Sequence, residues 1–291
     1  WLAPYSYSQL SGADGANFGA QQPPSAEHLL GTTVGGYDVL SRVIWGAQTA
    51  LMVVVVAIAM SVVVGIVLSL VSGYLGGWVD KALVVVADAI YAFPTLLLAI
   101  VVAIAINNGQ SGLWPGILAA AASITVVFIP QYFRVVRAEV VRVKSEAFVE
   151  SAQVIGASTP RIMFRHVLRN STRTLPLIVT LNASEAIATL AALGFLGFGI
   201  QPTVAAEWGF DLNKSISDVA AGIWWTAIPP GVAIVLTILG ITLIGESLND
   251  LADPRLRARR RSGGKRSASQ TPADAVASTE PTAQEFLGEV P

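Results

Sequence analysis

Residues 148–170 read FVESAQVIGASTPRIMFRHVLRN, a polar stretch that separates two long apolar segments. Gly156 lies near its centre and can adopt the left-handed conformation that ends a helix. Thr159 is suited to cap a following helix, because Pro160 then takes the first helical position. The stretch therefore predicts a short helix, a sharp turn and a second helix that runs toward Asn170.

The composition of the chain is that of a membrane protein. Of 291 residues, 53% are hydrophobic and 13% are charged, and the mean hydropathy is +0.62. Soluble domains carry about 25% charged residues. The absence of cysteine excludes disulfides, thiol catalysis and cysteine-ligated metals, and two histidines leave little for a histidine metal site.

Five segments are long and apolar enough to cross a bilayer, which takes roughly 20 residues as a helix. They are residues 50–71, 82–106, 113–133, 174–198 and 223–244. Asp88 and Pro94 interrupt the second, and Glu185 lies within the fourth. The runs lack the alternating pattern of a barrel. The sequence thus predicts an all-α polytopic membrane protein with five transmembrane helices, and with the third continuing into the cytosol.

Basic residues set the orientation, because Lys and Arg concentrate in cytoplasmic loops. Eight of them fall in 134–173 and seven more in 255–266, so both regions are predicted to be cytoplasmic. Residues 1–49 then form an extracytoplasmic segment, 50–249 a transmembrane domain, and 250–291 a basic and then disordered cytoplasmic tail. An exported N-terminal segment needs a preceding span, so we expect six spans in the native protein.

The central polar stretch has an amphipathic pattern. Phe148, Ala152 and Ile155 recur at i, i+4 and i+7, which predicts one apolar face. Arg161, Arg165 and Arg169 are spaced four apart and form a basic row on the second helix. Taken alone, this pattern also fits a helix that lies on the lipid surface.

Six positions in this stretch share the spacing of a known loop. Glu-x-Ala, a Gly four residues later, an Ile and a His-x-Leu resemble the EAA loop of ABC importer permeases, with Ser151 in place of the usual first Ala. The corresponding residues are Glu150, Ala152, Gly156, Ile162, His166 and Leu168. The resemblance implies a type I ABC importer-like permease, whose loop at 138–172 sits in a groove of a separate ATP-binding subunit.

Further segments extend the resemblance over about 28–257. They point to the second permease of the dipeptide, oligopeptide and nickel importer group. The segments are HLLGT (28–32), GYDVLSR (36–42), GYLGGWVD (73–80), Asp88 with FP (93–94), LGFLGFGIQP (193–202), EWG (207–209) and NDLADPRLR (249–257). Thr33 and Tyr37 stand where this group usually has Asp and Arg, and 204–206 depart from its Pro-rich turn.

The resemblance implies a permease subunit of an ATP-driven peptide importer in the bacterial plasma membrane. The chain would form half of the pathway, bind no cofactor, and work with a second permease, ATP-binding subunits that hold ATP and Mg²⁺, and an extracytoplasmic binding protein. It would bind no nucleic acid. The sequence has no phosphate-binding Gly-x-x-x-x-Gly-Lys-Ser/Thr loop. An ion-coupled secondary transporter and a membrane-embedded enzyme are the alternatives.

Two acidic residues inside predicted spans are candidates for the pathway, because intramembrane acids are costly. Glu185 lies near the middle of its span, where it is placed to meet a peptide amino group or to join an internal hydrogen-bond network. Asp88 lies nearer the cytoplasmic end, where snorkelling, capping of a helix or pairing with Lys81 gives it a structural role. We expect His166 to be a structural or interface residue.

Overall fold

The computed structural model describes residues 2–13, 15–106 and 112–252, and this part of the chain is helical with no strands. The chain divides into two compact units, Trp1–Glu246 and Ser247–Pro291. The predicted tail lies outside the described residues from position 253 onward. The elements are α1 (Val39–Leu75), α2 (Gly77–Tyr91), α3 (Thr95–Ile106), α4 (Leu113–Lys144), α5 (Ala147–Val154), α6 (Thr159–Arg161), the π-helix η1 (Ile162–Val167), α7 (Leu168–Ser171), α8 (Leu175–Phe195), α9 (Trp208–Lys214), α10 (Ile216–Ala220) and α11 (Ile228–Ala252).

Four helices of the described chain are long and apolar enough to cross a membrane: α1, α4, α8 and the Ile228–Leu248 part of α11. A fifth span results if the bent pair α2 and α3 is taken together. The predicted helical membrane class is confirmed, and so is the continuation of the third span, because α4 runs unbroken to Lys144. The fifth predicted span starts later than expected, at Ile228.

The second predicted span is two helices instead of one. Its axis bends by 99° between Tyr91, where α2 ends, and Thr95, where α3 begins. Pro94 explains the break, because proline has no N–H to donate and disfavours helical geometry at the residue before it, here Phe93. A hydropathy profile records the two helices as one apolar run.

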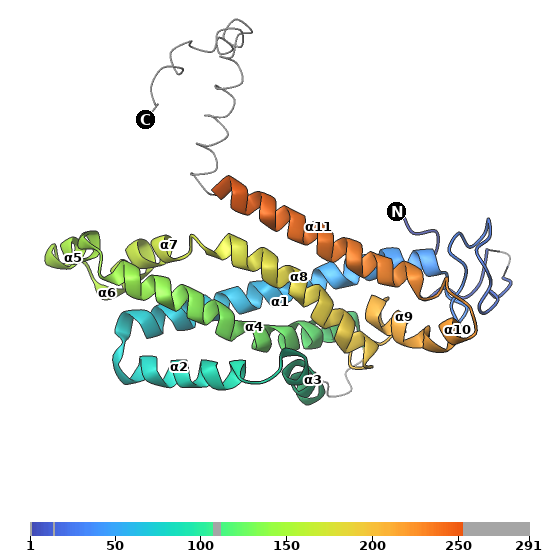
Figure 1. The fold of residues 1–291 in the computed structure, drawn as a ribbon, viewed down its shortest axis with the longest axis horizontal. Helices are drawn as coiled ribbons and strands as arrows, with labels where there is room; N and C mark the ends of the chain where they lie inside the picture. Colours follow the sequence, from blue (N-terminus) through green and yellow to red (C-terminus); the bar gives the residue numbers. More distant parts are fainter. Residues whose placement is uncertain (1, 14, 107–111, 253–291) are drawn as a thin grey trace, which may run out of the picture. The chain divides into compact units, whose positions relative to one another are not determined.

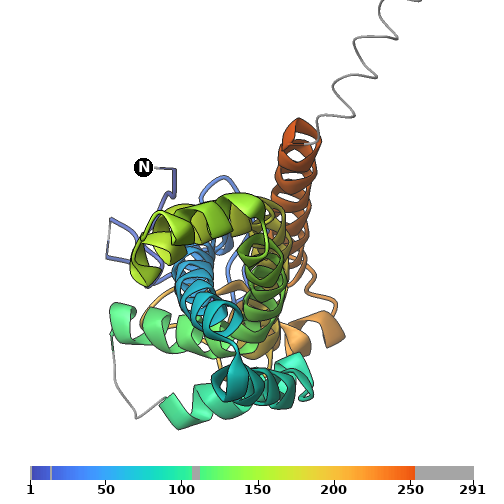
Figure 2. The same cartoon turned by 90° about the vertical axis from the view of Figure 1, so that its left-hand side faces the viewer.

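Helices α1 and α4 form the centre of the bundle and lie side by side (Figure 2). The face of α1 toward α4 carries a small residue at every fourth position: Ala57, Ser61, Gly65, Ser69 and Gly73. The hydroxyl of Ser69 donates to the carbonyl oxygen of Phe133 at 2.9 Å. Small residues let helix backbones approach closely, which stabilises pairs of membrane helices through packing and interhelical hydrogen bonds.

Replacing Gly65 by leucine is expected to destabilise the bundle. A Cβ atom at this position would lie 2.5 Å from the Cβ of Tyr132, so α1 and α4 have to separate. Overpacking of this kind costs about 1–3 kcal/mol. Thermal unfolding in detergent measures the effect, with Gly240→Leu on α11 as control, because a Cβ there meets no atom within 4 Å. Equal melting temperatures for the two variants would contradict the close-packing argument.

The two ends of the bundle carry different structures (Figure 1). The hairpin of α5, α6, η1 and α7 lies at one end, and α9, α10 and the N-terminal segment lie at the other. This separation agrees with the predicted topology, in which residues 134–173 and 1–49 are on opposite sides. The hairpin follows the end of α4 at Lys144, in the region predicted to be cytoplasmic.

Candidate functional site

The hairpin turns sharply at Gly156. This residue has φ 81°, the left-handed conformation predicted for it. The Ala157 N–H donates to the carbonyl of Ala152 at 3.0 Å, and the Gly156 N–H donates to that of Gln153 at 2.9 Å. This pair of bonds is the Schellman motif, which satisfies the last carbonyls of a helix. Ala152 and Gly156, both predicted site residues, thus build the turn itself.

The second limb of the hairpin differs from the predicted regular helix. Its N-cap is Ser158, and the predicted cap Thr159 is already the first helical residue. Pro160 is tolerated there because the first-turn N–H groups have no intrahelical partner. The chain then forms the π-helix Ile162–Val167. A π-turn places residues five apart on one side, and both Ile162 and Val167 are buried.

The apolar face predicted for the first helix is mostly surface, since Phe148 and Ile155 are both exposed. Val149 is the residue of α5 that is buried against the core, whereas Phe148 is exposed and Ala152 is only half-buried. The reason is the direction from which the second limb covers α5, which the spacing of residues does not contain. Four large apolar side chains of the hairpin, hereafter the apolar tip, remain exposed: Phe148, Val154, Ile155 and Phe164.

The six predicted site residues divide between the surface and the core of the hairpin. Glu150 and Gly156 are exposed, and Ile162 is buried. Ala152 and Leu168 pack against the core from half-buried positions. His166 is half-buried, and its carbonyl oxygen accepts a hydrogen bond from Nδ2 of Asn170 at 2.7 Å.

The predicted basic row is available to a partner. Arg161, Arg165 and Arg169 are all exposed, and none forms an ion pair with another described residue. Arg165 lies within the π-helix, so the three arginines are not aligned as they would be on a regular α-helix. The surface of the second limb is therefore cationic beside the apolar tip.

Polar contacts fasten the base of the hairpin to the bundle. Arg137 on α4 donates from Nε and Nη2 to the two carboxylate oxygens of Asp80 on α2, both at 2.6 Å. The hydroxyl of Ser72 on α1 also donates to Asp80. Lys144 Nζ donates to the carbonyl oxygen of Tyr74 at 2.6 Å. Bidentate Arg–carboxylate pairs fix geometry, so α1, α2 and α4 are tied together where α4 leaves the bundle.

Asp88 pairs with Arg134 and not with Lys81, which was one of the alternatives considered for it. One Nη2···Oδ1 distance is 2.6 Å, and both side chains are about half exposed. The guanidinium also lies 4.4 Å from the centroid of the Tyr91 ring. Arg134 lies 46 positions away along the chain, whereas Lys81 lies two helical turns away on α2 itself, so only the packing of α4 against α2 identifies the partner.

Glu185 faces a cavity of about 370 Å³. The cavity is lined by the break between α2 and α3, by Gln131 and neighbouring residues of α4, and by Glu185 from α8. Asp88 does not line it. Of the two predicted pathway acids, only Glu185 therefore faces this cavity. The break between α2 and α3 lines the same cavity, a proximity that the sequence did not indicate.

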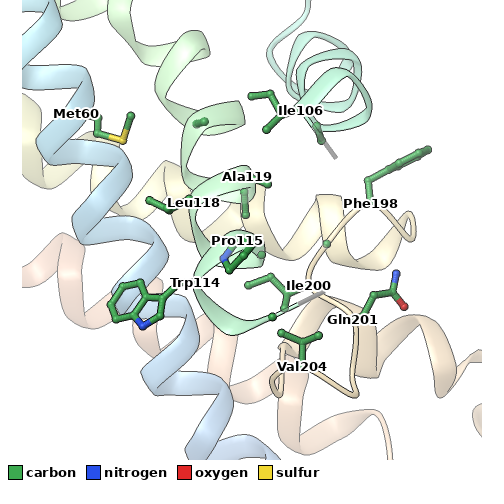
Figure 3. Close-up of a pocket in the computed structure, with 16 residues that line it drawn as sticks. Met60, Ile106, Trp114, Pro115, Leu118, Ala119, Phe198, Ile200, Gln201 and Val204 are labelled. Atoms are coloured by element: carbon green, nitrogen blue, oxygen red, sulfur yellow. The ribbon is translucent and has the colours of Figure 1, made fainter. Parts of the chain in front are cut away.

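A second cavity, of about 530 Å³, lies between α3, α4 and the segment that follows α8 (Figure 3). Its walls are largely apolar, with Trp114, Pro115, Phe198 and Ile200 around it and the amide of Gln201 at one side. None of its described lining residues is ionisable. The cavity therefore offers apolar contacts but no charged group to a ligand. The sequence did not indicate this cavity.

Buried charges organise the opposite end of the bundle. Arg42, 2% exposed, pairs with Asp211 on α9 at 2.6 Å. Glu207 caps α9, and its carboxylate oxygens accept the N–H groups of Gly209 and Phe210 at 2.8 Å. Burial raises the pKa of Glu207 to about 8, against the effect of these two bonds. The Glu-Trp-Gly sequence at 207–209 is the signal of this cap.

Replacing Glu207 by glutamine is expected to remove a pH dependence of stability. The folded pKa of about 8 lies above the ordinary value of 4.5, so the folded state binds the proton more tightly. The contribution of Glu207 to stability is then complete below about pH 4.5 and is lost as the pH rises toward about 8. Melting temperatures across this range measure the slope, with the exposed Glu27→Gln as control. An unchanged slope in Glu207→Gln would contradict the assignment.

Comparison with known proteins identifies the family. A family model described as the binding-protein-dependent transport system inner membrane component matches residues 65–258. The dipeptide transport system permease protein DppC of Alkalihalophilus pseudofirmus is 37% identical over 237 residues, 81% of this chain and 75% of that protein. The glutathione transport system permease protein GsiD is 33% identical in Pectobacterium atrosepticum, over 89% of this chain and 81% of that protein. In Escherichia coli it is 34% identical, over 88% and 80%.

A solved structure has the same fold. The MetNI methionine ABC transporter, in an inward-facing conformation, aligns with a TM-score of 0.57 and 14% identity, over 73% of this chain and 96% of that chain. At this identity the likeness concerns the fold alone. Together with the family match and the apolar helices, these similarities establish that the chain belongs to the binding-protein-dependent transport system inner membrane components, the permease subunits of ABC importers.

Proposed function

We propose that this chain is one of two permease subunits of an ATP-driven importer of short peptides and forms half of its translocation pathway. The observation that carries the proposal is the apolar tip, four large apolar side chains exposed on a hairpin at the end of α4. Exposed apolar surface rimmed by polar residues marks a site of contact with another protein or with a membrane. A partner that covers the tip on the cytoplasmic side is the natural occupant.

The hairpin is built to transmit movement. Ala152 and Gly156 form its turn, Ile162 and Leu168 pack its limbs against the core, and the base is tied by Arg137 to Asp80. A push on the tip therefore moves the helices as rigid bodies, which is how packed interfaces change state. Glu150, exposed in the first turn of α5, and half-buried His166 are proposed to set the register of the contact.

The energy source lies in other subunits. The chain has no phosphate-binding loop, so we assign ATP, Mg²⁺ and hydrolysis to partner ATP-binding subunits and no catalytic residue to this chain. A second permease completes the pathway, and an extracytoplasmic binding protein delivers the solute to the end that carries α9 and α10. The match to a binding-protein-dependent family supports this set of partners.

The substrate class follows from the relatives. They are described as dipeptide and glutathione permeases, and glutathione is itself a short peptide. Glu185, which faces a cavity between helices, is the candidate pathway residue. Asp88 is assigned the structural role of holding α2 to α4 through Arg134. The alternative of an ion-coupled transporter is not supported by the family to which the chain belongs.

Purification of the chain from native membranes, followed by reconstitution in liposomes, tests the proposal. The chain is expected to copurify with two ATP-binding subunits and a second permease. The vesicles are expected to take up labelled dipeptides only when ATP and the binding protein are present. Peptides of graded length give the size limit. Uptake driven by an ion gradient without ATPase subunits would refute the proposal.

A further inference from the structure

The cavity at the break between α2 and α3 combines features that single out one kind of ligand. It measures about 370 Å³, and its polar lining comes from Glu185, Gln131 and Thr95, with Phe93 and Phe128 among its apolar walls. Pockets of this size hold small molecules or the end of a longer one.

The break leaves backbone acceptors without partners at membrane depth. α2 has 15 residues, so the break lies about 22 Å along the helix axis from its first residue, within a hydrocarbon core of about 30 Å. Among the described residues no hydrogen bond reaches the carbonyl oxygens of Tyr91, Ala92 or Phe93. Irregular backbone is tolerated at this depth only when it is buried in protein or lines a wet cavity.

The carboxylate of Glu185 has no partner either. Within the described part of the chain it forms no ion pair and accepts no side-chain or backbone hydrogen bond, although its own carbonyl oxygen accepts one from Thr189. Its position, about 15 Å along α8 from Leu175, places it near the middle of the bilayer. An acid at this depth marks a functional site by default.

The two arginines that follow Gln131 along α4 are engaged elsewhere. Arg134 pairs with Asp88, and Arg137 pairs with Asp80. The cavity lining contains no Lys, Arg or His. Glu185 is exposed, so a cation that enters the cavity from outside the described chain can reach its carboxylate.

Resting on the proposed function, we propose that this cavity is a transient subsite for the protonated amino terminus of the transported peptide, with Glu185 as its counter-ion. An ammonium group has three donors and no acceptor. The carboxylate of Glu185, the free carbonyls of the break and the amide oxygen of Gln131 supply acceptors of the matching kind. Phe93 and Phe128 give apolar contact for the first side chain of the peptide.

Equilibrium dialysis of labelled Ala-Ala and N-acetyl-Ala-Ala against the permease–ATPase complex, without the binding protein, tests the subsite directly. The wild type is expected to bind Ala-Ala about tenfold more tightly than the acetylated peptide, because a hydrogen bond to a charged group is lost on acetylation. Glu185→Gln is expected to abolish this difference. Glu27→Gln serves as the matched acid-to-amide control and is expected to keep it, because Glu27 is exposed and lies outside the cavity.

The outcomes distinguish the subsite from the proposed function. An undiminished preference for Ala-Ala in Glu185→Gln would overturn the subsite. The subsite would also be overturned if the wild-type complex transports dipeptides but shows no measurable binding of Ala-Ala, since the cavity would then not hold the peptide. Failure of the wild-type assembly to transport any peptide would instead refute the proposed function. In Glu185→Gln vesicles we expect uptake of Ala-Ala to fall by about tenfold while the complex stays assembled.

Discussion

Replacing Gly156 by valine is expected to uncouple ATP hydrolysis from peptide uptake while the membrane bundle stays intact. Gly156 has φ 81°, and a β-branched residue in this conformation costs about 1–3 kcal/mol. A Cβ there meets no atom within 4 Å, so the destabilisation comes from backbone strain in the turn and not from a steric clash. The Schellman bonds that join the limbs then break, and the tip changes direction.

Uptake in vesicles is expected to fall by between about 5-fold and 150-fold, the equivalent of that free energy. Gly222→Val is the matched control, because Gly222 has φ 83° and no neighbour within 4 Å but lies beyond α10 at the other end of the bundle. Gly156→Asn should retain most uptake, since asparagine tolerates the left-handed conformation. Full uptake by Gly156→Val would show that the hairpin is not the coupling element.

Replacing Val154 and Ile155 together by lysine is expected to detach the ATP-binding subunits. These side chains are 88% and 85% exposed, so the fold of the hairpin does not need them. Burying each in a partner groove contributes about 1.5–3 kcal/mol, which is lost on substitution. Lysine is compatible with their position at the C-terminal end of α5, where the helix dipole favours positive charge. Affinity for the ATPase should fall by more than about a hundredfold.

Copurification of the ATPase with the double variant measures this loss, and thermal unfolding checks that the fold is retained. Ile216→Lys with Val219→Lys on α10 is the matched control, because these side chains are 54% and 53% exposed at the opposite end of the bundle. Copurification at the wild-type level in the Val154 and Ile155 variant would mean that the apolar tip faces lipid or solvent in the assembled transporter.

Local chemistry made part of this molecule predictable. The spans follow from the length of apolar runs, because each must cross the same hydrocarbon thickness. The left-handed Gly156 follows from its place between two helical patterns. The spacing of six residues at 150–168 pointed to the family that the comparisons then established.

Other features depend on which elements meet, and the sequence did not identify them. The buried face of α5 is the side of Val149, because the second limb covers it there. Asp88 pairs with Arg134 from a different helix. Arg42 and Asp211, separated by 169 positions, form a buried ion pair that no local sequence pattern predicts.

By itself the sequence determined that this is a helical membrane protein with a hairpin that turns at a glycine, since hydropathy, capping and turn preferences act between near neighbours in the chain. Only the tertiary structure decided which hairpin side chains are exposed and that Glu185 faces a broken helix across a cavity. Burial and the completion of hydrogen bonds depend on the approach of distant segments, and that approach is a property of the packed bundle.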